Sequence, residues 1–386
     1  MEATEKLFYE DSHLKEFDAV VLSCQPEGDR YKAVLSRTAF FPEGGGQYAD
    51  TGYIDGVKVL DVHERDNVVY HYTESPLEEG KTVHGKINWE ERFEKMQQHT
   101  GEHIISGIVH ETFGYNNVGF HLGSDYCTMD FDGPLTKEQL KEIEKRANGA
   151  VFENLDIEVG YPSKEELKTL DYRSKIEIEG QVRIVTVPGY DVCACCAPHV
   201  KKTGEIGLIK LVNMANYKGG ERITMLCGCR ALRDYDRKEE SVRAVSALLC
   251  AKENEISHAV EHMKAEVGAL KGEKASLENR LLAYKAQEVE ISEGVTAVFD
   301  SELSGNAPRE LMNCLLNRGA KISAVFAGND KDGYRYVIGS RSEDVRALCK
   351  RLNQAFLGRG GGKSEMVQGT LSGRQEEIEH ELGKEN

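Results

Sequence analysis

Long apolar runs and an excess of positive charge are both missing from this sequence. No stretch approaches the ~18 consecutive apolar residues that a membrane-spanning helix needs, so we expect no membrane partner. Residues 1–11 are acidic and polar, which predicts no secretory signal. The formal charge of −16 gives no support to nucleic-acid binding through long-range steering. Internal repeats and low-complexity linkers are also absent, and we expect a folded, cytoplasmic protein of two or three domains.

Local charge differs from this overall balance. Residues 340–374 hold seven Lys or Arg against three Asp or Glu, whereas the last twelve residues hold five Glu and one Lys. Phosphate contacts depend on where basic residues lie rather than on net charge. The composition therefore permits binding of a nucleic acid at the basic segment.

The ten cysteines are informative through their spacing. Cys193, Cys195 and Cys196 fall within four residues, and Cys227 and Cys229 form a second close pair. A chain without an export signal is expected in a reducing compartment, and neighbours this close rarely form good disulfides with each other. Metal binding and simple burial are the two interpretations; for Cys227 and Cys229 we expect burial in a strand.

Hydrophobic periodicity predicts an α+β protein with four parts. Short apolar segments at residues 19–24, 31–36, 57–62, 68–72 and 83–89 predict a small β-barrel or sandwich over residues 1–90. Residues 91–235 combine expected helices at 90–113 and 136–154 with strands at 182–187, 206–212 and 223–226. Residues 288–386 return to a mixed α/β pattern, with strands at 295–299 and 322–326, helices at 308–318 and 343–356, and a glycine-rich turn at 358–363.

Residues 236–287 have the spacing of a coiled coil. Apolar residues alternate three and four apart, and only Glu253 and Lys274 interrupt the seam. The seam consists of Val242, Val245, Leu249, Ile256, Val260, Met263, Val267, Leu270, Leu277, Leu281 and Tyr284. One helix from Val242 to Tyr284 spans on the order of 65 Å, and so narrow an apolar stripe needs a partner. We expect a homodimer, with packing onto the same chain as the alternative.

Two pairs of candidate metal ligands share one spacing. His99 and His103 lie four apart on an expected helix, so both rings lie on one face. Cys195 and His199 are also four apart. Either pair alone is a weak signal, but together one thiolate and three imidazoles are a ligand set that selects Zn²⁺.

Two other patterns need weighing. Residues 99–103 also fit H-x-x-E-H, the inverted zinc-protease signature, in which Glu102 is the general base; this alternative leaves Cys195 and His199 without a role. Residues 38–47 end in Gly44, Gly45, Gly46 and Gln47. Consecutive glycines let backbone N–H groups approach a ligand closely, although the glycines alone equally fit a flexible hairpin turn.

The order of these motifs resembles the editing domain of alanyl-tRNA synthetases and the free-standing AlaX proteins. The Thr-x-Phe-Phe-Pro-x-Gly-Gly-Gly-Gln segment, the His-Thr-x-x-His helix, and Cys-x3-His-Val before Thr203-Gly204-Glu205 follow one another as they do in that family. The glycine-rich C-terminal turn, with Met366-Val367-Gln368-Gly369 after it, is similar to the family's C-Ala domain. The long AlaX form is thereby implied over nearly the whole chain. A threonyl-type editing enzyme fits the Gly-Gly-Gly-Gln segment and the C-terminal part less well.

The resemblance implies roles for individual residues. His99, His103, Cys195 and His199 would hold zinc, Thr38 would read the hydroxyl of a mischarged serine, and Gln47 would close the loop beside the substrate. Gly101 stands where the family has Ala, and Cys196-Ala197-Pro198 where it has Gly-Gly-Thr, so Cys193 and Cys196 are extra thiols near the expected metal. Candidate phosphate contacts are Lys201, Lys202, Lys210, Lys218, Arg222 and the basic residues of 341–374, among them Arg359 and Lys363.

The implied function is trans-editing: zinc-dependent hydrolysis of the ester in mischarged Ser-tRNA(Ala), with Gly-tRNA(Ala) as a second candidate. The chain begins at the expected barrel, so we expect no ATP-dependent charging. Four protein ligands make a closed site, which leaves two ways for zinc to act: it gains a fifth ligand, or it orients the substrate. The alternative is a non-catalytic tRNA-binding protein with a structural zinc.

Overall fold

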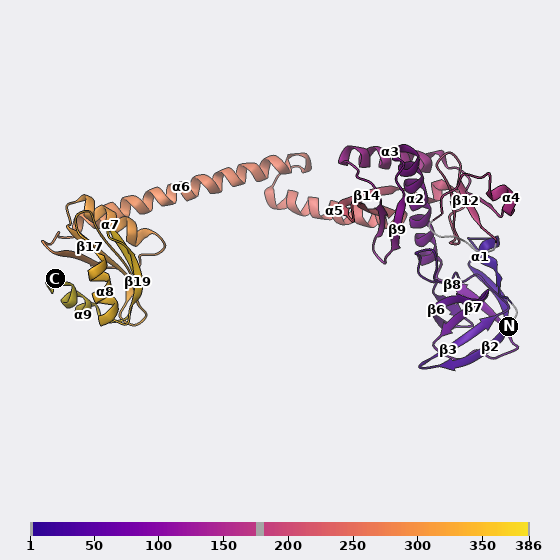
Figure 1. The fold of residues 1–386 in the computed structure, drawn as a ribbon, viewed down its shortest axis with the longest axis horizontal. Helices are drawn as coiled ribbons and strands as arrows, with labels where there is room; N and C mark the ends of the chain where they lie inside the picture. The colour runs from indigo at the N-terminus through magenta and orange to yellow at the C-terminus, as the bar shows by residue number, and fades with distance from the viewer. Residues whose placement is uncertain (1–2, 175–180, 385–386) are drawn as a thin grey trace. The chain divides into compact units, whose positions relative to one another are not determined.

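The structure is a computed structural model that describes residues 3–174 and 181–384. It divides into two compact units, Met1–Ala244 and Val245–Asn386 (Figure 1). Both contain helices and strands, so the expected mixed α+β class is confirmed. No helix of the described residues is long and apolar enough to cross a membrane.

The N-terminal unit begins with a closed six-stranded barrel in the order β2-β3-β7-β6-β5-β8. Its strands are β2 (Glu16–Glu27), β3 (Arg30–Leu35), β5 (Gly52–Ile54), β6 (Val57–Arg65), β7 (Val68–Thr73) and β8 (Thr82–Ile87). Alternating residues point inward, as in β2 and β8, and form one apolar core. Ahead of the barrel lie β1 (Glu5–Lys6), paired with β4 (Arg37–Thr38), and the short helix α1 (Leu7–Glu10).

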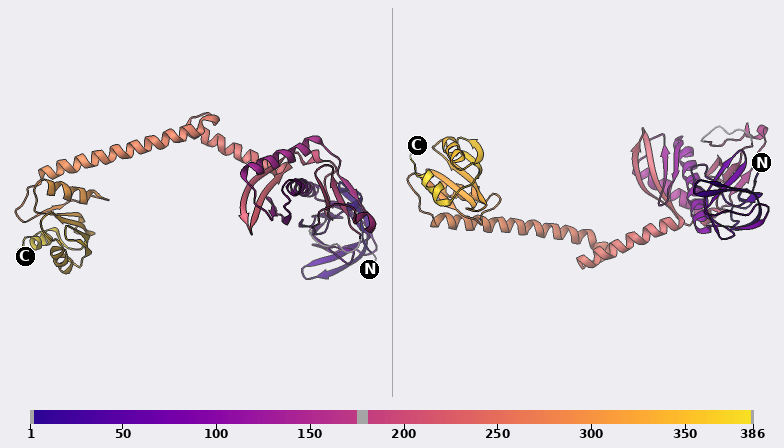
Figure 2. Two further views of the ribbon diagram at one scale, coloured as in Figure 1. Left: turned by 45° about the horizontal axis from the view of Figure 1, so that its top comes forward. Right: turned by 90° about the horizontal axis from the view of Figure 1, so that it is seen from below.

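Helix α2 (Trp89–Phe113) is the centre of the second part of this unit and contacts strands of two sheets (Figures 1 and 2). One sheet has the order β14-β15-β10-β9; the other has β11-β12-β13. The four-stranded sheet contains β9 (Asn117–Leu122), β10 (Cys127–Phe131), β14 (Ile209–Tyr217) and β15 (Gly220–Cys227). The three-stranded sheet contains β11 (Glu158–Gly160), β12 (Ile184–Val187) and β13 (Asp191–Ala194). Unlike a half-exposed helix, α2 is buried almost all round between Arg92 and Val109, which positions its polar residues inside the protein.

Helix α3 (Lys137–Glu153) covers α2 and β14. The expected N-cap is confirmed: Thr136 and Gln139 form a reciprocal capping box, and the helix ends at Asn154 in the left-handed conformation. The unit also contains α4 (Lys164–Leu167), the 3-10 turn η1 (Thr203–Ile206) and the first part of α5 (Gly228–Leu249).

The second unit contains a five-stranded sheet in the order β16-β17-β18-β20-β19. One face packs on α8 and α9, and the other packs on α7 and the end of α6. The elements are β16 (Val295–Phe299), α7 (Ala307–Asn317), β17 (Ile322–Asn329), β18 (Gly333–Ser340), α8 (Arg346–Ala355), β19 (Arg359–Lys363), β20 (Met366–Leu371) and α9 (Gln375–Leu382).

The single long helix expected over residues 236–287 is interrupted. Helix α5 (Gly228–Leu249) ends, the 3-10 turn η2 (Glu253–Glu255) follows, and α6 (Ile256–Glu288) begins. Cys250 has φ of 49°, and Ala251 N donates to Ser246 O at 3.1 Å, which is the bonding of a Schellman cap. The expectation of one helix was wrong because the 3-4 spacing of apolar residues continues through the cap. This spacing carries no information about the φ angle of a single residue such as Cys250.

The expected glycine-rich turn is instead an edge strand. Residues of β19 pair with β20 from Arg359↔Thr370 to Lys363↔Met366. A Cβ on Gly360 would lie 2.5 Å from Gln368 O, so glycine permits the close approach of the two strands.

Candidate metal centre

Helix α2 supplies two imidazoles to the interior of the N-terminal unit. His99 and His103 lie one turn apart, are each 2% exposed, and have ring centroids 5.4 Å apart. The helix continues past them and stops at Gly114, whose φ of 72° makes a left-handed C-cap. Both rings therefore project from a rigid, buried segment.

The loop after β13 brings two further side chains to the same place. Cys195 and His199 lie on this loop, and Arg183 fixes its backbone by donating from Nη1 to Cys195 O (2.8 Å) and Ala197 O (3.0 Å). The buried side chain of Ala197 packs on Phe8 and Phe41. The role of Arg183 had no signal in the sequence, because it depends on two carbonyl groups twelve and fourteen residues away.

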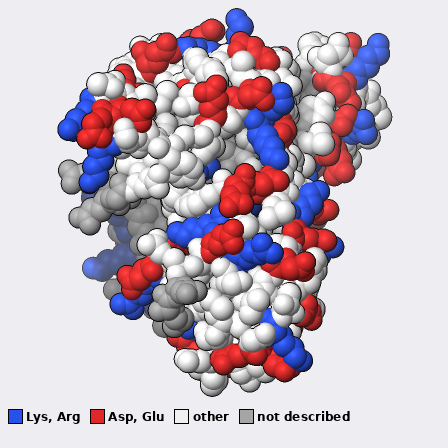
Figure 3. All heavy atoms as spheres, turned by 90° about the vertical axis from the view of Figure 1, so that its right-hand side faces the viewer, with Lys and Arg blue, Asp and Glu red and all other residues white. Residues whose placement is uncertain are grey.

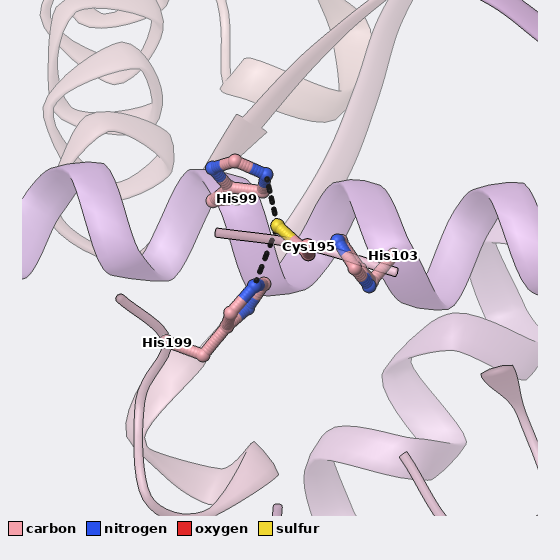
Figure 4. A group of neighbouring side chains, drawn as sticks. All are labelled: His99, His103, Cys195 and His199. Carbon is pink, nitrogen blue, oxygen red and sulfur yellow. Dashed lines mark hydrogen bonds between the residues drawn. The ribbon is translucent and has the colours of Figure 1, made fainter. Parts of the chain in front are cut away.

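The four predicted ligands form one cluster (Figure 4). One donor atom from each of His99, His103, Cys195 and His199 lies within 4.8 Å of the others. Cys195 Sγ is 3.5 Å from Nε2 of His99 and 3.5 Å from Nε2 of His199. The spacing in sequence therefore predicted a set that the fold brings together.

The electrostatics of the cluster suit a divalent ion. Burial lowers the pKa of His199 well below its ordinary value, and the neighbouring His103 and His99 lower it further, so it is neutral and its nitrogen can bind a metal. Burial raises the pKa of the Cys195 thiol. A bound cation would favour the thiolate at this partly buried position. These donor atoms fit zinc by type.

Partners on the far ring nitrogens orient two of the histidines. Gln47 Oε1 lies 3.1 Å from His99 Nδ1, and Thr100 Oγ1 lies 3.0 Å from His199 Nδ1. In both cases Nε2 is left facing Cys195. Thr100 was not predicted as a site residue, although its place between the two histidines was the available signal.

Gln47 reaches His99 from a tight turn. Gly44 N and O exchange hydrogen bonds of 3.0 Å with Gln47 O and N, and Gly45 and Gly46 both have positive φ, as a type I′ hairpin turn requires. A Cβ on Gly46 would lie 2.7 Å from the Phe120 ring. The segment is thus a hairpin turn, which was one of the two interpretations of the glycines, and it packs closely against Phe120.

A buried ion pair fastens this segment to α2. Asp50 Oδ2 accepts from Phe41 N (2.7 Å) and from Arg92 Nε (2.8 Å), and Arg92 Nη2 donates to Ala39 O at 2.7 Å. Both charged side chains are buried. The clamp holds the two ends of the glycine-rich segment against the helix that carries the histidines.

Thr38 ends the short strand β4, which pairs with β1 outside the six barrel strands, and is fully buried. Its hydroxyl is 2.8 Å from His71 Nε2 and accepts from Phe40 N at 3.1 Å. Burial lowers the pKa of His71 to about 4, so the ring is neutral. The Thr38 hydroxyl is therefore bonded to the barrel strand β7 and to its own segment, whereas Gln47 reaches the cluster.

The extra thiols occupy separate positions. Cys193 is grouped with His103 and Asp191 rather than with the four-residue cluster. Cys196 is exposed and its Sγ would be 3.3 Å from a Cβ on Gly45. Of the second pair, Cys227 is buried at the end of β15 as expected, whereas Cys229 is exposed on α5, so its expected burial in a strand is wrong.

The interior of the protein leaves no room for a side chain at Gly101. A Cβ at this position would lie 2.4 Å from Cys227 Sγ. Both residues are buried, so neither can move aside into solvent. The glycine on α2 and the thiol on β15 are therefore matched to each other.

Glu102 belongs to a buried hydrogen-bond network. Its Oε1 accepts from Ser106 Oγ (2.7 Å) and Asn117 Nδ2 (2.6 Å), and Oε2 is 3.8 Å from His103 Nε2. Glu102 is 1% exposed. This environment suits a structural carboxylate better than the general base of the protease alternative.

Most basic candidates of the N-terminal unit are paired with carboxylates. The ion pairs are Lys201–Asp11, Lys202–Asp156, Lys210–Glu144 and Arg222–Asp130, and Lys218 lies over the Tyr217 ring. On the face in Figure 3, basic and acidic side chains are interspersed. In the second unit, Arg359 and Lys363 are exposed on β19.

Two family models match parts of the chain. One is described as the threonyl and alanyl tRNA synthetase second additional domain and matches residues 182–244. The other is described as tRNA synthetases class II (A) and matches residues 3–91. These matches cover the barrel and the segment that carries Cys195 and His199.

Similar proteins include alanyl-tRNA editing protein Aarsd1 of Rattus norvegicus, 29% identical, with 96% of this chain and 95% of the relative covered. Alanyl-tRNA editing protein AlaX-L of Pyrococcus horikoshii is 28% identical, with 97% and 96% covered. Alanine–tRNA ligase of Pyrococcus furiosus is 31% identical over 95% of this chain but 42% of the ligase.

These matches define the class as proteins built from domains shared with aminoacyl-tRNA synthetases. The two relatives matched over nearly their full length both carry the name of alanyl-tRNA editing proteins. The chain belongs to this AlaX-type family of editing proteins.

Proposed function

We propose that the chain is a zinc-dependent trans-editing hydrolase that removes serine from mischarged Ser-tRNA(Ala), with Gly-tRNA(Ala) as a second substrate to test. The carrying observation is the cluster of three buried histidines and one partly buried cysteine, with Gln47 of the glycine-rich turn on one of its ligands. Family membership supports alanyl-tRNA as the substrate class.

In this proposal His99, His103, Cys195 and His199 would hold zinc, and the chemistry it would supply there is polarisation of the ester carbonyl or of the attacking water. Gln47 would have a second role in the reaction. Its Oε1 is used on His99, whereas its buried Nε2 has no hydrogen-bond partner. An unpaired buried donor costs free energy, and a substrate carbonyl oxygen would satisfy it. Gln47 would thus stabilise negative charge on that oxygen during hydrolysis.

Thr38 is proposed to discriminate serine from alanine, as the family resemblance implies. A site that bonds a substrate hydroxyl can reject the analogue without it by ~10⁴-fold. Because the Thr38 hydroxyl already contacts His71 and Phe40 N, this role requires it to exchange a partner. Thr38→Val tests it: the preference for Ser-tRNA(Ala) over Ala-tRNA(Ala) should fall, whereas an unchanged preference would leave Thr38 a structural residue.

For the tRNA body we propose the glycine-rich edge of the C-terminal sheet. Arg359 and Lys363 are exposed there, and a cavity of about 450 Å³ beside it is lined by Arg346 and Lys350 of α8. A second cavity of about 450 Å³ is lined by Arg309, Arg341 and Lys363. Exposed cations that flank a backbone edge suit phosphate contacts.

The deciding experiment compares deacylation of Ser-tRNA(Ala) with that of Ala-tRNA(Ala). Wild type should release serine and spare alanine, and Cys195→Ala should abolish release because a ligand is lost. Cys229→Ala is the matched control, since this thiol is exposed on α5 and its removal should leave the rate unchanged.

A second candidate is a non-catalytic tRNA-binding protein with a structural metal, which the four-ligand set favours because catalytic zinc usually keeps an open position. Metal-loaded, folded wild type that binds tRNA(Ala) but releases no serine would establish it. Removal of the metal also distinguishes the two candidate functions. Loss of a structural ion should unfold the chain, whereas loss of a catalytic ion should leave the chain folded but inactive.

A further inference from the structure

The third histidine of the cluster has a partner of a different kind. His103 Nδ1 lies 3.0 Å from Asp191 Oδ2, which is within ion-pair distance but outside hydrogen-bond geometry, and both side chains are buried. The partners on His99 and His199 are a neutral amide and a neutral hydroxyl. Asp191 therefore gives the cluster a carboxylate contact on a far ring nitrogen, whereas Glu102 Oε2 lies 3.8 Å from the other nitrogen of His103, Nε2.

An arginine holds this carboxylate in place. Arg173 Nε donates to Asp191 Oδ1 at 2.7 Å and Nη2 donates to Oδ2 at 2.9 Å. Its backbone is fixed as well, because Arg173 N donates to Val192 O and Arg173 O accepts from Ala194 N, each at 2.9 Å. A bidentate pair of this kind fixes the plane of the carboxylate as well as its position.

Asp191 is also tied to the ligand loop by the chain itself. It begins strand β13, and Cys195 follows that strand directly. One short segment thus carries a ligand, Cys195, and a carboxylate that lies beside another ligand, His103.

His103, Asp191 and Cys193 would also form a group able to hold an ion of their own. The contacts of Asp191 argue against that use. Both of its oxygens already accept from a guanidinium, so a second cation would have to displace Arg173 and leave its charge buried without a partner, which is costly. The arrangement fits an outer carboxylate on a single metal centre better.

We propose that Asp191, held by Arg173, is a positioning residue for the metal ligand His103. It fixes the ring so that Nε2 is the nitrogen left to bind the metal, and it makes that nitrogen a stronger ligand, as a carboxylate–histidine–metal arrangement does. The inference rests on the metal centre of the proposed function. It requires no particular tRNA substrate.

The test is metal affinity rather than turnover. Full-length protein is stripped with a chelator and titrated with Co²⁺, whose thiolate charge-transfer band reports Cys195 in the coordination sphere. Competition with Zn²⁺ then gives the zinc affinity. Asp191→Asn should lower affinity by about tenfold to a hundredfold and alter the Co²⁺ spectrum, with one metal bound per chain in the wild type.

A matched control is Asp130→Asn. Asp130 is a carboxylate in an equivalent bidentate pair with Arg222 (2.6 and 2.7 Å), but it joins β10 to β15 and is not among the metal-cluster residues. Its affinity and spectrum should match the wild type. Because Asp191→Asn strands a buried guanidinium, the double variant Arg173→Gln/Asp191→Asn carries the test if the single variant does not fold.

Wild-type affinity and spectrum in folded Asp191→Asn or the double variant would overturn the inference. Two Co²⁺ ions per wild-type chain, falling to one in Asp191→Asn, would overturn it in favour of a second metal site. Absence of Co²⁺ binding by wild type would remove the metal centre and the inference together. A loss of affinity in Asp191→Asn supports it even if wild type deacylates no tRNA, so the two proposals fail separately.

Discussion

Oε1 of Gln47 lies 3.1 Å from Nδ1 of His99, which joins the glycine-rich turn of one motif to the helix of another across 52 positions of sequence. The contact leaves Gln47 Nε2 buried without a partner. One side chain thus orients a metal ligand and keeps a donor free for a substrate oxygen.

This geometry predicts different outcomes for two changes at Gln47. Gln47→Glu keeps an oxygen for His99 but removes the free donor, so the single-turnover rate on Ser-tRNA(Ala) should fall by about 10²–10³ with metal affinity retained. Gln47→Ala should lower both. Zinc competition and quenched-flow deacylation check the pair, and a wild-type rate in Gln47→Glu would rule out the donor role.

The close match of Gly101 and Cys227 predicts a compensating pair. Gly101→Ala should destabilise the protein by about 1–3 kcal/mol, because the added methyl overpacks the interior at 2.4 Å from Cys227 Sγ. Cys227→Ala in the same chain should recover part of this loss. Denaturant unfolding measures both variants.

The control for this pair is Gly149→Ala on α3. A Cβ there would lie 3.8 Å from Tyr190 Oη, so the substitution should be neutral or stabilising through helix propensity. A double variant no more stable than Gly101→Ala would show that the two positions are independent.

An ion pair between α2 and α5 predicts a pH dependence of stability. Both Glu94 oxygens accept from Arg233, at 2.7 and 2.8 Å, and these bonds lower the pKa of Glu94. A carboxyl group whose pKa is lower when folded stabilises the protein above its unfolded pKa of about 4.3. That contribution is lost as pH falls through the folded pKa.

Glu94→Gln should therefore be less stable than wild type at pH 7, by at most about 1 kcal/mol for a partly exposed pair. The two should converge as pH falls from about 5 to 3. Thermal melts at several pH values measure the difference, with the exposed Glu142→Gln as control. A difference that persists at pH 3 would show that the carboxylate charge is not the cause.

Phosphate contacts at β19 predict a change in salt dependence. Arg359→Ala and Lys363→Ala should each weaken tRNA binding and reduce the slope of log K against log salt by about 1. The reason is that each variant releases about one counterion fewer from the tRNA on binding. Lys321→Ala is the control, since Lys321 pairs with Glu343 at 3.2 Å. Unchanged slopes in both variants would move the tRNA site elsewhere.

The apolar stripe of α6 predicts a homodimer through this helix. Leu270 and Leu277 are 56% and 60% exposed in the single chain, an unfavourable position that a partner helix would relieve. Leu270→Glu/Leu277→Glu should yield monomers by light scattering after gel filtration. Lys271→Glu, beside the seam, should leave the mass unchanged; a wild-type mass in the leucine variant would refute the coiled coil.

The sequence by itself determined the mixed α+β class, most of the barrel strands, the capped helix at Thr136 and the four clustered residues. These follow from local rules: alternation in strands, capping chemistry, and the i, i+4 spacing that puts two ligands on one helix face. It missed the break at Cys250 and read β19 as a turn, because a φ reversal and a strand of glycines leave no periodic signal.

Only the tertiary structure decided how the cluster is supported. Arg183 bonds to backbone carbonyls of the loop that carries Cys195. The ion pairs Arg92–Asp50 and Arg173–Asp191 join segments that are distant in the sequence. The structure also shows that the Thr38 hydroxyl contacts His71 of the barrel, whereas Gln47 reaches His99. Residue types and spacing name the groups that can bind a metal, but hydrogen-bond partners depend on which surfaces the fold brings into contact.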